Sequence, residues 1–431
     1  MSTPANEIYG LLSGDDDVRL CKDIPESACR HLPRNFLIHL VALAATKTGD
    51  LLASPKLVLP WLLHAAGVPA AFSAWLVPIR ESGSMAPQML VAHWIRKAPR
   101  RKNYWVFGSL VQALALLGIW AAVAGLPPLA AGFSCLGLML VFSLARGLCS
   151  VAVKDVMGKT VSRQRRGRVS GDAASLAGLT ACGLAFALIL GVIDQAAAGL
   201  LLLAAAALWL LGALLYMGVV ESPGATEGGV SAWQHAWAAM GRLRSDEVLR
   251  RFVLTRALLL GTALSAPFYV ALAAEAGGTM SGFGGLLLAQ GAADFLSGPV
   301  WGRMSDRSSR RVMLLCAALA TALGLAVLIC ASAQVQGLVG MLVYALAYGL
   351  LSVIHAGVRL ARKTYVIDAA GADDRADYVA VSNTATGLLL LLGGALGSAA
   401  ALLGPQYAVL LFAFGTAAAM VVGRRLPEVE D

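Results

Sequence analysis

The chain has 431 residues, of which 58% are hydrophobic and only 14% are charged. A soluble domain averages about 25% charged residues, so this composition excludes an ordinary soluble protein and indicates one that crosses a membrane many times. The net charge of +9 does not indicate a nucleic-acid partner, because the basic residues are concentrated in short loops between apolar segments. The seven cysteines show no metal-ligand spacing, so we expect no metal site and no cofactor.

Twelve apolar segments are long enough to cross a bilayer. They cover residues 36–63, 68–92, 105–125, 128–153, 171–194, 199–220, 252–274, 281–302, 312–332, 337–358, 379–402 and 405–423. Loops after the odd-numbered segments contain no Lys or Arg, whereas the alternate loops are basic, so the positive-inside rule predicts cytoplasmic termini. We therefore predict an all-α membrane protein of twelve transmembrane helices, located in a cell (inner) membrane of bacterial type.

The segments divide into two pseudo-symmetric halves of six. Residues Met139–Val151 (MLVFSLARGLCSV) and Met341–Val353 (MLVYALAYGLLSV) agree at nine of thirteen positions, each in the fourth segment of its half. Parallel repeats of six spans are a transporter architecture, with the substrate site at the midplane between the halves. The predicted parts are a cytoplasmic tail at 1–35, a six-helix bundle at 36–220, a cytoplasmic linker with an amphipathic helix at 221–251, a second bundle at 252–423 and a cytoplasmic tail at 424–431.

Charged residues interrupt the first two segments near mid-depth. Lys47, Asp50 and Lys56 lie in the first, and Arg80 and Glu81 lie in the second. A charge at the bilayer centre costs roughly 2.5 to 3.5 kcal/mol, so these residues need partners or a water-filled cavity. One interpretation is a buried ion-pair network that only fixes helix packing. The other, which we favour because apolar side chains often stabilise such a position equally well, is a substrate and proton site.

The roles within this polar layer follow from charge. A carboxylate in a low-dielectric cavity can load and release a proton when its cationic partner moves, and we expect Asp50 rather than Glu81 to do so. Lys47, Arg80 and Lys56 are expected to bind an anionic group of the substrate. Because Arg80 and Glu81 are adjacent, their side chains diverge by roughly 100° around the helix and cannot both point straight into one cavity.

Other polar residues of the spans are weaker candidates. Gln88 and Gln290 occupy matching segments of the two halves, and Asp294 lies near mid-depth of the eighth, so all three are included in the predicted substrate and proton site. We expect Arg146 to lie a turn or two from the cytoplasmic end, where it extends to the surface or forms a pair. His355 is expected to be an interhelical histidine with its hydrogen bonds satisfied.

The loop between the eighth and ninth segments reads GRMSDRSSRR. Gly302 permits close helix approach, and Asp306 is expected to accept hydrogen bonds from arginines or to cap the next helix. The stretch resembles the cytoplasmic signature of the major facilitator superfamily, with Ser309 in place of its second glycine. The resemblance implies a latch that holds the inner helix ends together in the outward-open state, formed by Gly302, Asp306, Arg307, Arg310 and Arg311.

The first half departs from that family pattern, because HWIRKAPRRKNYW keeps the basic residues but lacks the glycine and aspartate. The fifth segment also lacks the Gly-Pro pattern of drug antiporters. No phosphate-binding loop, no HExxH and no ATPase-sized soluble domain is visible, so we predict a transporter driven by a gradient and not an enzyme.

The predicted function is secondary transport of a small polar or anionic solute by alternating access, coupled to protons, by a monomer in the lipid bilayer. The alternatives are an uncoupled facilitator, a drug or metabolite exporter, and a membrane assembly or sensor protein that keeps this fold without transporting.

Overall fold

The computed structural model describes residues 29–85, 91, 94–95, 97–192, 199–223, 241, 243–369 and 375–429. In these ranges the regular structure is helical, with no strand. Residues 1–28 of the predicted tail, residues 224–240 of the predicted linker and Gln88 lie outside the described residues.

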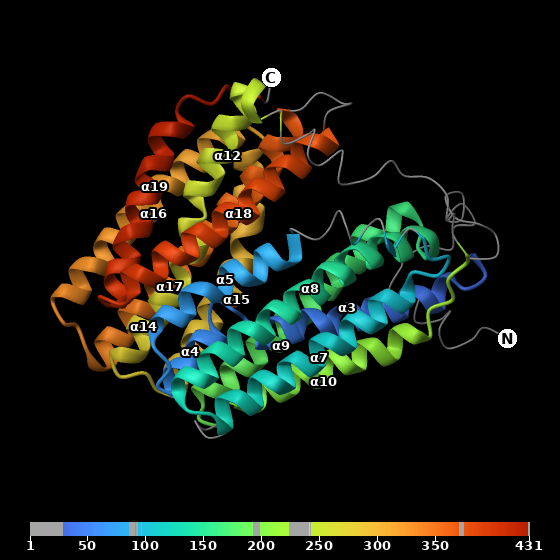
Figure 1. Ribbon diagram of the computed structural model, residues 1–431, viewed down its shortest axis with the longest axis horizontal. Coiled ribbons are helices and arrows are strands. Elements are labelled where there is room, and N and C mark those ends of the chain that lie inside the picture. Colours follow the sequence, from blue (N-terminus) through green and yellow to red (C-terminus); the bar gives the residue numbers. More distant parts are fainter. Residues whose placement is uncertain are drawn as a thin grey trace.

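The helices of the two halves follow the predicted segments (Figure 1). The first half contains α3 (Leu32–Leu52), α4 (Val58–Ala65), α5 (Ala70–Met85), α7 (Lys102–Gly125), α8 (Pro128–Thr160), α9 (Arg163–Ile189) and α10 (Leu200–Met217). The second contains α12 (Glu247–Leu259), α13 (Gly261–Leu264), α14 (Ala266–Glu275), α15 (Met280–Ser305), α16 (Ser309–Ser332), α17 (Gly337–Asp368), α18 (Arg375–Ala401) and α19 (Pro405–Gly423). The repeated sequence lies on α8 and α17, the fourth span of each half.

Nine of the described helical segments are long and apolar enough to cross a membrane by length and composition. The other predicted spans are α3 with α4, α5 and α15, which contain the charged candidates of the sequence analysis. The helices therefore fit an integral membrane protein with the predicted layout of twelve spans.

The first span is discontinuous and the seventh is kinked, which the sequence analysis did not anticipate. The predicted segment 36–63 is interrupted between Leu52 and Val58, where Pro55 lacks the N–H that would continue the helix. The seventh span, Glu247–Glu275, is one helix that is only kinked at Leu260 and Ser265, between α12, α13 and α14, and the backbone there stays in the right-handed helical region. Discontinuous helices at membrane depth are found where non-helical backbone is buried in protein or lines a cavity.

The two halves pack together along two helix pairs, α5 with α18 and α9 with α15. They also meet through α4 and α14, and the ring of Trp61 on α4 lies 5.1 Å from that of Phe283 on α15. Figure 1 shows the halves joined near α4 and α14 and diverging toward the end where both termini lie.

The hydrophobic core has the same asymmetry. The largest cluster of buried apolar residues includes members of both halves, such as Trp61 and Phe268. The clusters nearer the termini belong to one half each: Phe252 and Tyr365 lie in a cluster of the second half, and Phe36 and Trp105 lie in two clusters of the first. The described residues thus form one core across the halves at the end opposite the termini and separate cores at the other end.

Candidate functional site

Asp50 on α3 is the centre of a charge cluster in the first half. Its Oδ1 accepts a hydrogen bond from Nη2 of Arg80 on α5 at 3.2 Å, and its Oδ2 lies 2.5 Å from Nη2 of Arg146 on α8. Lys47, one turn earlier on α3, donates instead to the backbone carbonyl of Ser170 on α9 at 3.0 Å. The cluster therefore connects four helices, and Lys47 does not form the direct pair with Asp50 that its spacing allowed.

Two glycines bring the arginines together. A Cβ on Gly83, three residues after Arg80, would lie 2.7 Å from the Cβ of Ser143 on α8. A Cβ on Gly147, the residue after Arg146, would lie 3.0 Å from the carbonyl oxygen of Ser84. Small residues allow helices to approach closely, so α5 and α8 cross where their arginines both reach Asp50.

Aromatic rings support both guanidinium groups. Arg80 lies over the ring of Phe142 at 5.1 Å from its centroid, and Arg146 lies over Trp209 at 5.2 Å. Cation–π contacts of this kind are worth about 0.5 to 2 kcal/mol and fix the planes of the guanidinium groups. The two guanidinium groups are thus held by aromatic rings of α8 and α10 as well as by the carboxylate of Asp50.

The cluster carries more positive than negative charge. Lys47, Arg80 and Arg146 contribute three cations, and Asp50 is the one carboxylate bonded to them among the described residues. The side chains of Arg80, Asp50 and Arg146 remain 14%, 20% and 29% exposed, so the cluster is not sealed. An accessible group of cations with a single carboxylate can bind an anion, because Arg presents several donors to a carboxylate or phosphate.

Among the described residues, Glu81 forms no ion pair within this cluster, although its charge acts on its neighbour Arg80. Its charge interacts with Arg256 on α12 and Arg362 on α17, both in the second half. Arg256 itself is only 5% exposed and donates to Ser382 Oγ at 2.6 Å and Asn383 Oδ1 at 2.9 Å, both on α18. Arg80 therefore bonds within the first half, whereas the charge of Glu81 also acts on arginines of the second half.

Lys56 lies in the interruption between α3 and α4 and reaches the second half. Its Nζ is 3.0 Å from Nε2 of His355 on α17, whose Nδ1 is 2.9 Å from Oγ1 of Thr262 on α13. On the same wall, the hydroxyl of Tyr348 donates to Oε1 of Gln290 at 2.5 Å. These residues line a cavity of about 40 Å³ together with Ala266, Leu351, Ser352 and Arg359.

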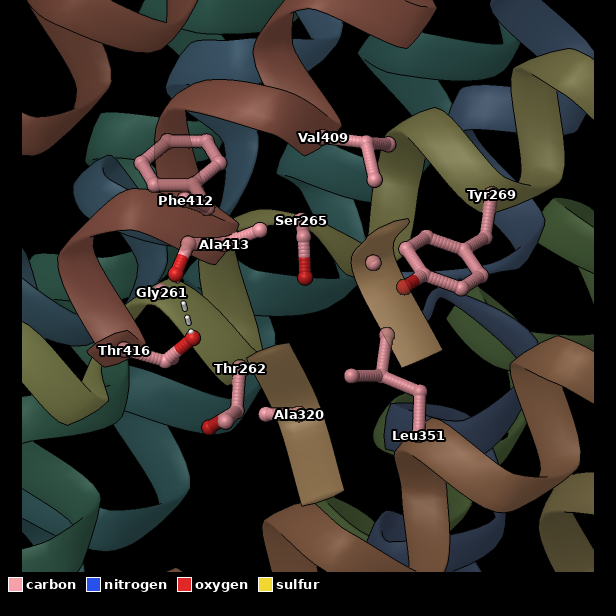
Figure 2. A pocket seen from close by; sticks show the side chains of 11 residues that line it. Gly261, Thr262, Ser265, Tyr269, Ala320, Leu351, Val409, Phe412, Ala413 and Thr416 are labelled. Atoms are coloured by element: carbon pink, nitrogen blue, oxygen red, sulfur yellow. Dashed lines mark hydrogen bonds between the residues drawn. The ribbon is translucent and has the colours of Figure 1, made fainter. Parts of the chain in front are cut away.

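A second, smaller hollow of about 10 Å³ lies within the second half, between α13, α14, α16, α17 and α19. Figure 2 shows the hydroxyls of Ser265 and Tyr269 directed into it and the Thr416 hydroxyl bonded to the carbonyl of Ala413. Thr262 belongs to the lining of both cavities. This volume suits about one water molecule, so we assign the hollow to the packing of the seventh span.

The loop between α15 and α16 differs in detail from the sequence interpretation. The N-cap of α16 is Ser308, whose side chain accepts from the backbone N–H of Arg311, and not Asp306, which ends α15. Arg310 and Arg311 pair with Glu428, at 3.0 and 3.4 Å, and Glu428 also accepts from Ser308 Oγ at 2.6 Å. The predicted latch residues Gly302, Asp306 and Arg307 lie at the end of α15 and in the turn after it.

Sequence reasoning placed some of these residues correctly and missed others. Asp50 and Arg80 lie together as expected, whereas the side chain of Asp294 and the whole of Gln88 lie outside the described residues. Arg146 was expected to extend to the surface or to form a pair; it pairs with Asp50, and it lies about 21 Å before the end of α8 at Thr160. Arg146, Arg256 and His355 share one signal, a cationic or polar side chain inside an apolar segment.

Residues 252–431 match the sequence model of the Major Facilitator Superfamily. No curated protein resembles the chain closely enough in sequence to count as a relative.

Solved structures resemble the chain over nearly its whole length. They include the nucleoside transporter NupG (12% identity, TM-score 0.67, covering 91% of this chain and 99% of that one) and a D-xylose-proton symporter (12%, 0.67, 91% and 98%). The peptide transporter POT in complex with sulfate is also similar (13%, 0.66, 99% and 97%). At these identities the likeness shows the fold alone.

Proposed function

We propose that the chain is a secondary transporter of the major facilitator type that moves a small anionic solute together with a proton. The proposal rests chiefly on the charge cluster around Asp50, in which one carboxylate shares its two oxygens between Arg80 and Arg146. The similar structures include a proton symporter and transporters of small polar molecules, which supports this class of substrate.

The mechanism we propose is a competition for the arginines. An anionic group of the solute binds Arg80 and Arg146 and displaces the carboxylate of Asp50. A carboxylate that loses its cationic neighbours in a partly buried site binds a proton more readily. Anion and proton are then carried together, one proton on Asp50 for each anionic group bound, so that a singly charged solute crosses without net charge.

Alternating access follows from the two-core arrangement. With the termini on the cytoplasmic side of an inner membrane, the joined end faces outward and the present structure is open to the cytoplasm. We propose that the halves rock about the α5–α18 and α9–α15 contacts, so that the separate cores near the termini approach while the shared core parts.

The test is solute-dependent proton movement into proteoliposomes, across a panel of neutral sugars, nucleosides, carboxylates and phosphate esters. Wild-type protein should carry protons with an anionic member of the panel, and Asp50→Asn should abolish that proton movement. Asp172→Asn is the matched control, because Asp172 is 42% exposed and pairs only locally with Arg168 on α9.

The remaining outcomes separate the alternatives. Solute uptake without proton movement, unchanged in Asp50→Asn, would indicate an uncoupled facilitator. Proton movement opposite to that of the solute would indicate an exporter working by exchange. An absence of flux with every solute would favour a membrane assembly or sensor protein of this fold.

A further inference from the structure

The hydrogen bonds around His355 fix its protonation state. The Thr262 hydroxyl donates to the carbonyl of Leu259 at 2.8 Å, so its oxygen accepts from Nδ1–H of His355 at 2.9 Å. Nε2 of the same ring therefore carries a lone pair, which accepts a hydrogen bond from the ammonium of Lys56 at 3.0 Å. His355 is a neutral imidazole bonded at both nitrogens.

This arrangement makes Lys56 and a proton competitors for one lone pair. Protonation at Nε2 turns the acceptor into a donor, and it places two cations at a distance suited to a hydrogen bond. The charges of Lys56, Arg359 and Arg362 all act on His355. A charged imidazole is therefore incompatible with the observed bond to Lys56.

The described side chains that bond the ring or line its cavity are cations, amides, hydroxyls and apolar groups, and the carboxylate of Glu81 acts on Arg362. The bond partner and the cavity lining contribute Lys56 from the α3–α4 interruption, Thr262 from α13 and Gln290 from α15. The ring's own helix contributes the cations Arg359 and Arg362 and the hydroxyl of Tyr348. The cavity of about 40 Å³ has room for a few water molecules that can deliver a proton.

The bond also joins the halves, because Lys56 belongs to the first and His355 to the second. It lies beside the interruption that leads into α4, the helix that packs against α14 at the joined end. We propose that His355 is a second proton-binding residue of the transport cycle, whose protonation releases Lys56 and lets the halves part at the end opposite the termini. This inference rests on the proposed function for its role in transport, and on the hydrogen bonds alone for its pH dependence.

The direction of the pH effect follows from linkage. The joined state cannot take a proton on Nε2 without losing the bond to Lys56, whereas the parted state leaves that lone pair open to a proton. Acid therefore favours the parted state, and where only the parted state binds the proton the ratio of parted to joined molecules rises by up to about tenfold per pH unit.

The experiment measures the distance between two spin labels on a cysteine-free background in nanodiscs. One label is at Ala65, the last residue of α4, and the other is at Glu275, the last residue of α14. Both positions are exposed. The wild-type distance distribution should shift to longer values between pH 8 and pH 5. His355→Gln should stay short throughout, since the amide oxygen still accepts from Lys56 but binds no proton. His64→Gln, a partly exposed histidine of α4, should respond as wild type.

Two results would overturn the inference: a wild-type distance that does not change with pH, and an acid response that persists in His355→Gln. A measurement on the wild type alone covers the case in which that variant does not fold. In ¹⁵N NMR of labelled histidine at pH 8, His355 should be neutral with a proton on Nδ1, and a protonated Nε2 would contradict the assignment. The distance response is independent of flux, so a protein that carries no solute can still confirm the switch, and a working symporter can still refute it.

Discussion

At the scale of residues, the main feature of the polar layer is that each carboxylate interacts with more than one arginine. Asp50 uses its two carboxylate oxygens on two arginines from different helices, and Glu81 interacts with two more in the other half. Each carboxylate is therefore shared, and a solute anion can take one of its partners without leaving an isolated charge behind. We expect such sharing in a site that exchanges ligands, because breaking a one-to-one ion pair would leave an isolated charge in a partly buried site.

Removing the charge of Asp50 should destabilise the protein. Asp50→Asn leaves Arg80 and Arg146 in a partly buried site without a counter-ion, and we expect a loss of about 3 kcal/mol in the free energy of unfolding. Steric trapping in bicelles measures this loss, with Asp172→Asn as a control that should change it by less than about 0.5 kcal/mol. The double variant Asp50→Asn/Arg146→Gln should recover part of the loss, and a double variant less stable than the sum of the single changes would contradict the pairing.

The sequence predicted which residues form the polar layer better than it predicted their partners. Lys47, Asp50, Arg80 and Glu81 were identified from the cost of charge in an apolar span. Which of them touch depends on helix crossing and rotation, which hydropathy does not contain. Arg146 was expected to pair or to extend to the surface, but hydropathy could not name Asp50 as its partner.

At the scale of elements, the crossing of α5 and α8 positions both arginines. Gly83→Ala would bring a Cβ within 2.7 Å of Ser143 Cβ, so the two helices must separate. Overpacking of this kind costs about 1 to 3 kcal/mol, and the Arg80–Asp50–Arg146 geometry should loosen with it. We expect weaker solute binding as well as lower stability.

Gly137→Ala on α8, the helix that Gly83 of α5 packs against, is the matched control, because nothing lies within 4 Å of a Cβ there. It should be neutral or stabilise the protein by up to about 1 kcal/mol through helix propensity. Equal effects of the two substitutions on stability and on solute binding would show that the close approach at Gly83 does not position the arginines.

The interrupted first span and the kinked seventh span are the elements that sequence patterns described least well. Both read as continuous apolar stretches, and apolarity measures membrane depth but not helix continuity. Pro55 and Pro267 were the available signals, since proline cannot donate the helical hydrogen bond. Both regions contribute to the site: Lys56, between α3 and α4, contacts Nε2 of His355, and Thr262 on α13 contacts its Nδ1.

At the scale of the whole molecule, the halves repeat a lock at the end that carries the termini. Glu221 follows the sixth span and accepts the backbone N–H of Arg101 and of Lys102 at the start of α7, at 3.0 and 2.8 Å. Glu428 follows the twelfth span and accepts from Ser308 at the start of α16. The separation in sequence is 120 residues in both pairs, Arg101–Glu221 and Ser308–Glu428. This equivalence extends the repeat seen between α8 and α17.

The two locks should differ in strength. The Glu221 side chain is fully buried, also binds Lys159 at 3.1 Å, and cannot give both backbone donors an acceptor once it is an amide. Glu221→Gln should therefore lower the free energy of unfolding by about 2 to 3 kcal/mol. Glu428→Gln, at a side chain 29% exposed, should cost about 1 kcal/mol or less in the same assay. A larger effect at Glu428 would contradict this ranking.

The most direct test of the account is whether the two ends of the molecule open in alternation. One label pair at Arg100 and Arg424 reports the end with the termini, and the pair at Ala65 and Glu275 reports the other end; all four positions are exposed. Distances are measured in lipid at pH 5 and pH 8, with and without the solute that drives proton flux. The account predicts that every condition that lengthens one distance shortens the other. Two distances that lengthen together, or that stay constant while solute and protons cross the membrane, would contradict transport by alternating access between these halves.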